Sequence, residues 1–318
     1  MTDTTQRTAD QRLNDVLEAF MREHRADRRK SFILRILMWT YLIGSTIAFV
    51  VFINTGKASQ ATEETAHVAK VDVIGQIKRK GGVAAYPTIE ALTKAFETET
   101  AEAIILDMDS PGGSAAQSDL VYRELLRLRQ EHPEKPVYAV VGDVCASGCY
   151  YIASAADEII VNRTSMIGSI GVRMDGFDFT GLMEKVGVER RVLSAGKNKV
   201  LTDPFLDMDP EVRAHLEQNV LSQTHKVFIE AVKEGRGDRL VADNEVFSGL
   251  VWLGEQAIEK GLADSLGSIQ TVVRNMGDDI KAVNYTNRPV KILDWITGRA
   301  VQAVSNIVSD TRQPQLEF

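Results

Sequence analysis

Two short segments combine serine with glycine in a way that suits the chemistry of acyl transfer. The first, DSPGG, covers residues 109–113, and the second, CASG, covers residues 145–148. Each follows an apolar run typical of a buried strand, and the carboxyl ends of parallel strands share one edge of a sheet. A serine at a tight strand-to-helix turn exposes its hydroxyl, and glycine lets backbone N–H groups approach a developing oxyanion. A Ser-Gly turn is also typical of an ordinary helix N-cap, so neither segment decides the function alone.

The elements that would position these turns alternate along the chain. Apolar runs indicate strands, and helical spacing of apolar residues indicates helices. The expected strands cover 71–77, 103–108, 137–141 and 158–161, and the expected helices cover 88–97, 118–130, 149–155 and 210–233. This alternation favours an α/β fold of parallel βαβ units, with helices on the faces of the sheet.

A segment of another kind precedes these units. Residues 36–53 (ILMWTYLIGSTIAFVVFI) carry no charge, and a stretch of this length crosses a bilayer core of about 30 Å. On the C-terminal side of this run, the nearest basic residue is Lys57. On its N-terminal side there are six basic residues: Arg22, Arg25, Arg28, Arg29, Lys30 and Arg35. The positive-inside rule then places the N-terminus in the cytoplasm. The long charged stretch before the apolar run indicates an uncleaved anchor rather than a signal peptide; the alternative is a buried helix of a soluble protein.

Composition excludes several classes of function. The 318-residue chain has a formal net charge of −7, which argues against nucleic-acid binding as its main role. Two cysteines provide neither a disulfide framework nor a four-cysteine zinc site. Asp107, Asp109 and Asp143 are interpreted as turn-capping carboxylates rather than metal ligands. The five histidines are interpreted as surface residues, so we expect no metal and no organic cofactor.

Five segments, in order along the chain, resemble those of the S49 serine peptidases, the family that includes the signal peptide peptidase A type. They are DMDSPGGS (107–114), CASGCYYIASAADEIIV (145–161), MIGSIGV (166–172), SAGKNKVLTDPF (194–205) and VFSGLVWLGEQAIEKGLADSLGS (246–268). The resemblance covers about residues 71–268. It implies a ClpP/crotonase-like fold and a ring-like homo-oligomer, in which nucleophile and base come from one subunit or from two neighbours.

The resemblance also implies roles for individual residues. Ser147 would be the nucleophile and Lys199 the general base, with Lys197 as the alternative base two residues away. The oxyanion hole would be formed by Gly113 and Gly148. Two supporting residues complete the implied site, Ser169 to orient the lysine and Gly112 to shape the turn. A lysine base requires an apolar surrounding that lowers its pKa from about 10.4.

Both cysteines lie beside the implied nucleophile. Cys149 stands where the family commonly has glycine, and Cys145 precedes Ser147 by two residues. Cysteine is the stronger nucleophile, so either thiol could be mistaken for the reactive group. We expect Cys149 to pack as a small apolar residue.

We therefore predict a membrane-bound serine endopeptidase that degrades signal peptides or other hydrophobic membrane-derived peptides. Its location would be the bacterial inner membrane, with one span, a cytoplasmic N-terminus and a periplasmic catalytic domain. The expected partners are hydrophobic peptides, the lipid bilayer and further copies of the chain, and no nucleic acid. The expected parts are a cytoplasmic tail (1–30), a transmembrane anchor (31–54), a linker (55–69), the S49 peptidase domain (70–285) and a C-terminal amphipathic helix and tail (286–318).

Two other functions fit parts of the sequence. One is a catalytically weak membrane scaffold that binds hydrophobic segments, which an intact Ser147 and Lys199 disfavour. The other is a crotonase-type acyl-CoA enzyme, since an oxyanion hole also stabilises thioester enolates. The apolar span and the lysine segment disfavour the acyl-CoA enzyme.

Overall fold

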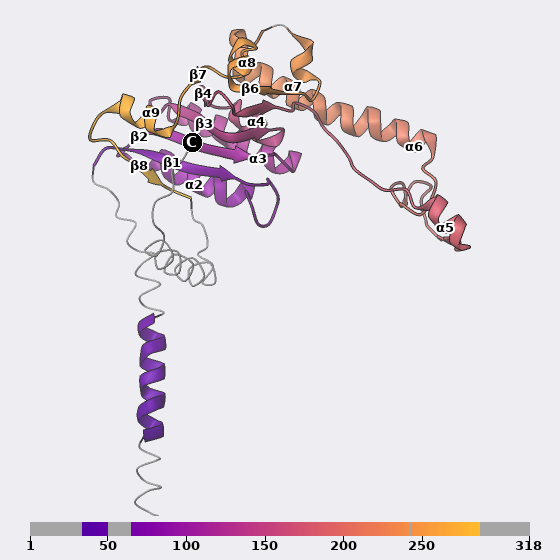
Figure 1. Ribbon diagram of the computed structural model, residues 1–318, viewed down its shortest axis with the longest axis horizontal. Coiled ribbons are helices and arrows are strands. Elements are labelled where there is room, and N and C mark those ends of the chain that lie inside the picture. Colours follow the sequence, from indigo (N-terminus) through magenta and orange to yellow (C-terminus); the bar gives the residue numbers. More distant parts are fainter. Residues whose placement is uncertain (1–33, 50–64, 242, 287–318) are drawn as a thin grey trace, which may run out of the picture. The chain divides into compact units, whose positions relative to one another are not determined.

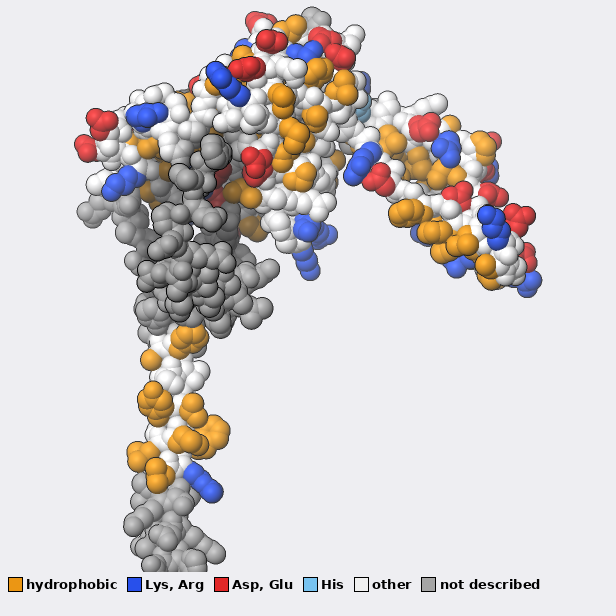
Figure 2. Space-filling model, in the orientation of Figure 1, with side chains coloured by type: hydrophobic (Ala, Val, Ile, Leu, Met, Phe, Trp, Pro, Cys, Tyr) orange, Lys and Arg blue, Asp and Glu red, His pale blue; other side chains and the backbone are white. Residues whose placement is uncertain are grey.

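The computed structural model describes residues 34–49, 65–241 and 243–286, and these belong to two compact units, 1–63 and 64–318. In the first unit, residues 34–49 form a helix whose side chains are exposed and mostly hydrophobic (Figure 2). Its hydroxyl side chains bond to the helix backbone: Thr40 and Thr46 donate to the carbonyls of Ile36 and Leu42, and Ser45 donates to that of Leu42. Among the described residues, no helix is both long and apolar enough to span a membrane. The predicted tail 1–30 lies outside the described residues, as do 287–318 of the predicted C-terminal helix and tail and parts of the predicted anchor and linker.

The second unit is built on one sheet whose first three strands are parallel. These strands are β1 (His67–Ile74), β2 (Ala101–Ser110) and β3 (Val137–Ala146), connected by α2 (Ala85–Glu97) and α3 (Ala115–Glu131). The strand order is β6-β5-β3-β2-β1-β8, with β4 paired to β3 and β7. The remaining strands are β4 (Glu158–Val161), β5 (Met166–Gly168), β6 (Val251–Leu253), β7 (Ser265–Leu266) and β8 (Ala282–Asn284). The predicted parallel βαβ units are confirmed, but the sheet is mixed because β6 runs antiparallel to β5.

Helices cover both faces of this sheet, as Figure 1 shows. Side chains of β2 alternate between the two faces: Ile104, Leu106 and Met108 belong to the main core, whereas Ala103 and Ile105 belong to a smaller one. The main core is closed by α2, α3, α4 (Gly148–Ala153) and α7 (Ser222–Arg236), and the smaller one by α9 (Ile269–Met276). Because β2 is buried on both sides, it reads in the sequence as a continuous apolar run rather than an alternating one.

The first strand begins earlier than expected. β1 starts at His67 rather than at residue 71, and His67 is buried, with its Nε2 atom 2.8 Å from the hydroxyl of Tyr285. The interpretation of His67 as a surface residue is therefore wrong. A single histidine next to a small polar stretch carries no periodic signal, and the partner that buries it lies 218 residues away.

A long helical segment leaves the core and carries an arm, which we define as residues 174–221. It contains α5 (Thr180–Val186), α6 (Pro210–His215) and the π-helical turn η1 (Leu216–Leu221), and α7 continues from η1 into the core. Figure 1 shows α5 and α6 projecting away from the sheet. Among the described residues of the arm, only Val212 has a buried side chain.

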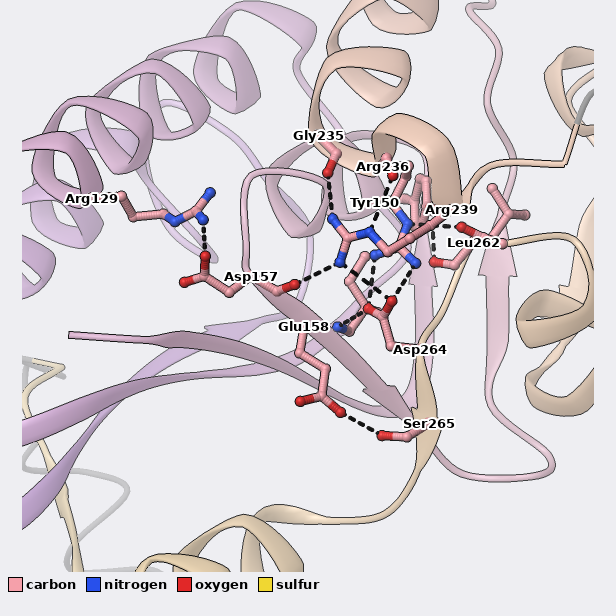
Figure 3. A network of polar contacts seen from close by, with 12 residues as sticks. Arg129, Tyr150, Asp157, Glu158, Gly235, Arg236, Arg239, Leu262, Asp264 and Ser265 are labelled. Atoms are coloured by element: carbon pink, nitrogen blue, oxygen red, sulfur yellow. Dashed lines mark hydrogen bonds and ion pairs between the residues drawn. The ribbon is translucent and has the colours of Figure 1, made fainter. Parts of the chain in front are cut away.

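A polar network fixes the inner end of α7 to the sheet (Figure 3). The buried guanidinium of Arg236 donates to both carboxylate oxygens of Asp264, each at 2.8 Å, and to the carbonyl of Gly261. Asp264 also accepts from the N–H of Ile159 at the start of β4. Burial raises the pKa of the Asp264 carboxyl, but Arg236, the N–H of Ile159 and Arg239 together lower it more, so it lies below its usual range. This network anchors the helix that supports the arm.

Candidate functional site

Ser147 lies at the turn between β3 and α4, with backbone angles φ 54° and ψ −123°. A non-glycine residue at positive φ is strained by about 1–3 kcal/mol. Its N–H donates to the carbonyl of Gly168 at 2.8 Å, and its carbonyl accepts from the N–H of Tyr151 at 3.0 Å. Within the described residues, the Ser147 hydroxyl has no hydrogen-bond partner, and it faces an open cavity of about 1350 Å³. We call this the Ser147 cavity.

Two glycine amides lie beside this serine. In the parallel pairing of β2 with β3, Ser110 at the end of β2 lies opposite Cys145 near the end of β3. The turns that follow these two strands therefore lie at the same edge of the sheet. Gly113 and Gly148 both line the Ser147 cavity. Among the described residues, neither N–H group donates to a backbone or side-chain acceptor. Two uncommitted N–H groups next to a hydroxyl form the arrangement that stabilises an oxyanion.

Gly112 lets the two turns approach each other. Its φ is +92°, and a Cβ atom there would lie 2.6 Å from the carbonyl oxygen of Ala146 and 2.8 Å from the nitrogen of Gly148. Gly113 also has a positive φ, 153°, and a Cβ on it would collide with the backbone of Ile77. A side chain at Gly112 would therefore displace the Ser147 turn, and one at Gly113 would displace the backbone at Ile77.

Ser169 is brought to the same cavity by β5. Among the described residues, Ser147 and Ser169 are the two non-glycine residues at positive φ. The N–H of Ser169 donates to the carbonyl of Leu250 at 2.7 Å, and its side chain lines the cavity without a hydrogen-bond partner among the described residues. Strain of this kind concentrates at functional sites, because the backbone is held there by the structure around it.

Lys199 lies elsewhere. Its side chain is exposed, it does not line the Ser147 cavity, and it has no ion-pair partner among the described residues. The segment that carries it, between α5 and α6, bonds to other parts of the arm: Phe179 N–H donates to Pro204 O, and Arg190 pairs with Asp203. Lys197 differs from Lys199, because its Nζ atom lies 2.9 Å from a carboxylate oxygen of Glu211. Within one chain, the structure thus assembles the serine and the glycines but not the lysine.

The wall of the cavity contains residues that the sequence analysis did not single out. Ser118 of α3 is fully buried against Gly148, where a Cβ atom would contact its hydroxyl. The hydroxyl of Tyr151 donates to Asp119 at 2.9 Å, and burial together with this bond raises the pKa of Tyr151 above its usual value. Tyr151 packs on Phe228 of α7 with ring centres 5.0 Å apart. Tyr151 lies one helical turn after Ser147, and that spacing is the signal that could have indicated it.

The two cysteines are joined. Cys145 in β3 and Cys149 in α4 form a disulfide, with 5.1 Å between their Cα atoms. Both residues are fully buried, as expected for Cys149, but the expectation that Cys149 packs as a free apolar side chain is wrong. The i,i+4 spacing within a helix does not favour a disulfide, whereas the strand-to-helix turn brings the two Cα atoms within the usual bonding range.

Two of the three carboxylates considered as metal ligands, Asp107 and Asp109, have structural partners. Asp107 accepts from Lys70 at 2.7 Å, and Asp109 accepts from the N–H of Val144 at 3.2 Å. Within the ranges that the structure describes, no group of three His, Cys, Asp or Glu side chains could hold a metal ion.

Comparison with known proteins places this mixed α/β chain in a family. The model of peptidase family S49 matches residues 129–283. A predicted protease of Synechocystis sp. is 32% identical over 204 residues, covering 63% of this chain and 70% of that protein. The chloroplastic serine protease SPPA of Arabidopsis thaliana is 34% identical over 186 residues, covering 58% of this chain and 27% of the plant protein. The chain belongs to peptidase family S49.

Other similarities are partial. The chain is 43% identical over 210 residues to a protein of Brucella abortus named Na⁺/H⁺ antiporter NhaA, covering 63% of this chain and 28% of that protein. The chain thus spans well under two thirds of the length of this relative. Among solved structures, a variant of the 1510-N membrane-bound stomatin-specific protease with a substrate peptide aligns with a TM-score of 0.45 and 17% identity, covering 74% of this chain and 99% of that one.

Proposed function

We propose that this chain is a serine endopeptidase in which Ser147 is the nucleophile, Lys199 is the general base, and the N–H groups of Gly113 and Gly148 form the oxyanion hole. The observation that carries the proposal is the strained Ser147 turn, where a hydroxyl and two amide N–H groups face one cavity without hydrogen-bond partners among residues 34–49, 65–241 and 243–286. Membership of a serine peptidase family supports it.

The reaction follows from these groups. The Ser147 hydroxyl attacks the substrate carbonyl carbon and gives its proton to the neutral amine of Lys199. The negative charge that develops on the carbonyl oxygen is stabilised by the N–H groups of Gly113 and Gly148. Lys199 then returns the proton to the leaving amine, and water hydrolyses the resulting acyl-enzyme.

We propose further that Lys199 reaches the Ser147 cavity of a neighbouring copy. The support is geometric: Ser147 and Ser169 present hydroxyls that have no hydrogen-bond partner in the described part of the chain, while Lys199 is exposed on the arm of the same chain. Exposed apolar side chains on the arm, including Phe177 and Leu193, suit a contact between copies. A lysine ammonium acts as a base only after it loses its proton, and burial at such a contact favours that loss.

The ammonium of Lys197 pairs with Glu211, whereas Lys199 has no ion-pair partner where the structure describes the chain, and this favours Lys199 as the base. The apolar part of the cavity wall, formed by Tyr151, Val227 and Phe228, suits a hydrophobic substrate side chain. We propose extended hydrophobic peptides, such as released signal peptides, as the substrate class.

We propose that residues 31–54 anchor the chain in a bacterial inner membrane, with the catalytic domain on the periplasmic side. The uncharged run 36–53 and the basic residues before it support this topology. In the helix 34–49, hydroxyl side chains bond to the backbone of their own helix, which suits an apolar surrounding. The Cys145–Cys149 disulfide supports an oxidising compartment for the catalytic domain.

Hydrolysis of a fluorogenic hydrophobic peptide by the detergent-purified full chain tests the dyad. Ser147→Ala and Lys199→Ala should each lower kcat by at least about 10³-fold, as in other serine peptidases that lose a dyad or triad member. Lys197→Ala is the matched control and should keep near wild-type activity. Full activity in Ser147→Ala would exclude Ser147 as the nucleophile, and a folded but inactive wild type would favour the scaffold function.

Co-expression of the two inactive variants tests the neighbouring copy. A site with Ser147 from one chain and Lys199 from another would be intact in roughly a quarter of the positions of a random assembly, because each residue is wild type in half of the chains. Recovery of about that share of wild-type activity is the expected result. No recovery from a co-purified mixture would place both residues of the dyad in one chain.

A further inference from the structure

The disulfide encloses the candidate nucleophile. Cys145 is the second-last residue of β3, and Cys149 is the second residue of α4. Between them lie Ala146, Ser147 and Gly148, so the ring contains the strained serine and one of the two amides of the oxyanion hole. Among the described residues there is no other cysteine, and the full sequence contains only these two.

The loop that this disulfide closes is too short for its main effect to be a restriction of the unfolded chain. A disulfide that closes a long loop stabilises a protein by restricting the unfolded state, and this effect falls with loop length. Here the two cysteines are four residues apart. The constraint therefore falls mostly on the residues inside the ring, whose conformation sets the position of the Ser147 hydroxyl.

Each sulfur is attached to a firmly held element. Cys145 pairs in register with Ser110 of β2 on one side and with Ile167 of β5 on the other. Cys149 is fully buried in the main core at the start of α4. The disulfide thus ties the beginning of a helix of six residues to the end of a central strand. Ser147 itself makes two backbone hydrogen bonds in the described structure, one donated to Gly168 and one accepted from Tyr151.

We propose that the Cys145–Cys149 disulfide is a positioning element of the peptidase site. It holds the Ser147 hydroxyl and the Gly148 N–H in their reactive arrangement, so the rate of peptide hydrolysis depends on its oxidation state. This inference rests on the proposed function. The cysteines do not touch the reacting atoms; they act through the turn that they enclose.

Formation of the disulfide is a thiol–disulfide exchange with an oxidised dithiol partner. The thiolate of one cysteine attacks the partner's disulfide, one partner sulfur leaves as a thiolate, and the second cysteine then displaces the other. The pair loses two electrons and two protons in total, and the partner is reduced to a dithiol. Because both cysteines are fully buried, the finished disulfide reacts with external thiols only when the turn opens locally.

Steady-state kinetics of the full chain test the proposal. Wild type is measured in its oxidised form and after reduction with a phosphine, beside the double variant Cys145→Ala/Cys149→Ala. Reduction should lower kcat about tenfold or more, since small displacements of a reacting group have effects of this size, and should leave KM within about twofold. The double variant should resemble reduced wild type and should not respond to the phosphine, because it contains no other cysteine. Equal kcat in the oxidised and reduced forms would overturn the proposal.

Three controls separate the possible failures. Alkylation and mass spectrometry report whether the cysteines are paired, independently of activity, and free thiols in the purified protein would overturn the proposal. Circular dichroism on reduced wild type shows whether the fold is kept, so that the comparison stands even if the double variant does not fold. Labelling of Ser147 by a fluorophosphonate reports on the nucleophile. Oxidised wild type that neither labels nor hydrolyses peptide would overturn the proposed function, and the positioning role with it.

Discussion

Ser147 and Ser169 share an unfavourable backbone conformation that glycine would adopt more easily. Serine at such a position makes the folded protein less stable than glycine would. Its presence is explained where the hydroxyl group itself is needed. Both hydroxyls face the same cavity, and both backbones are fixed by hydrogen bonds from their own N–H groups. The surrounding structure therefore holds both serines in a conformation that their own backbone preference disfavours.

Gly112→Ala should strongly reduce peptide hydrolysis. The added Cβ would meet the nitrogen of Gly148 and the Cβ of Ser147, each at 2.8 Å, and so displace the proposed oxyanion hole and nucleophile. Loss of one oxyanion donor lowers kcat by about 10²–10³-fold, and we expect an effect of that order.

Gly75→Ala is the matched control for this substitution. Gly75 has nearly the same φ, +95° against +92° for Gly112, but an added Cβ would meet nothing within 4 Å. The two variants place alanine at nearly the same positive φ, so the difference between their kcat values reports mainly on the contact. Similar kcat values in the two variants would contradict the role given to Gly112.

The sequence allowed the serine and glycine positions to be predicted because they lie in short turns directly after strands. The cavity brings together Ser147, Ser169, Gly112, Gly113 and Gly148, although their catalytic roles remain predictions. The position of Lys199 could not be predicted, since local spacing does not say whether a segment folds onto its own core or projects from it. The disulfide was missed for a similar reason, because it depends on the angle of one turn.

The contribution of a single ion pair to the anchoring of helix α7 can be tested by substitution. Arg236 at its C-terminal end is buried, and Asp264 neutralises it in the network of Figure 3. Asp264→Asn should lower the free energy of unfolding by about 3–5 kcal/mol, since it leaves a buried charge without its partner. Urea unfolding measures this. The exposed Asp238→Asn in the same region is the control and should change stability by less than about 0.5 kcal/mol.

The same pair predicts how stability changes in acid. Because the pKa of Asp264 is lower in the folded protein than its unfolded value of about 3.9, its contribution is complete above that value and is lost as pH falls through the folded pKa. Wild type should therefore lose stability below about pH 4 more steeply than Asp264→Asn does. Equal acid dependence in urea unfolding of both proteins would show that this pair does not contribute.

The long helix illustrates what periodicity can and cannot predict. A single helix over 210–233 was expected, and the structure has helix throughout this range, but with the π-helical turn η1 in its middle. Its inner part buries Phe228, Ala231 and Val232, whereas its outer part leaves Val220 exposed. Apolar residues recur at helical spacing both in the part of the segment that packs on the core and in the part that projects from it. The sequence therefore did not show where the packed part ends.

For the whole molecule, the arm is the feature that a single chain does not explain. Figure 2 shows hydrophobic side chains gathered along it, and Phe177 and Leu193 are among the most exposed hydrophobic residues described. Phe177→Ser/Leu193→Ser should weaken association between copies and reduce hydrolysis, while leaving the melting temperature nearly unchanged. Tyr86→Ser, at an exposed position outside the arm, is the control. An unchanged assembly size in light scattering would contradict this role of the arm.

The pairing of β1 has a consequence for how the chain is made. One edge of β1 pairs with β2, but the other pairs with β8, and the N–H of Asp72 donates to the hydroxyl of Thr286, 214 residues later. At synthesis rates of 5–20 residues per second, roughly 10–40 s separate the appearance of these two residues at the ribosome. During that interval the edge of β1 offers unpaired N–H and C=O groups to any other strand. A nascent chain of this protein is therefore most exposed to mispairing before β8 is translated.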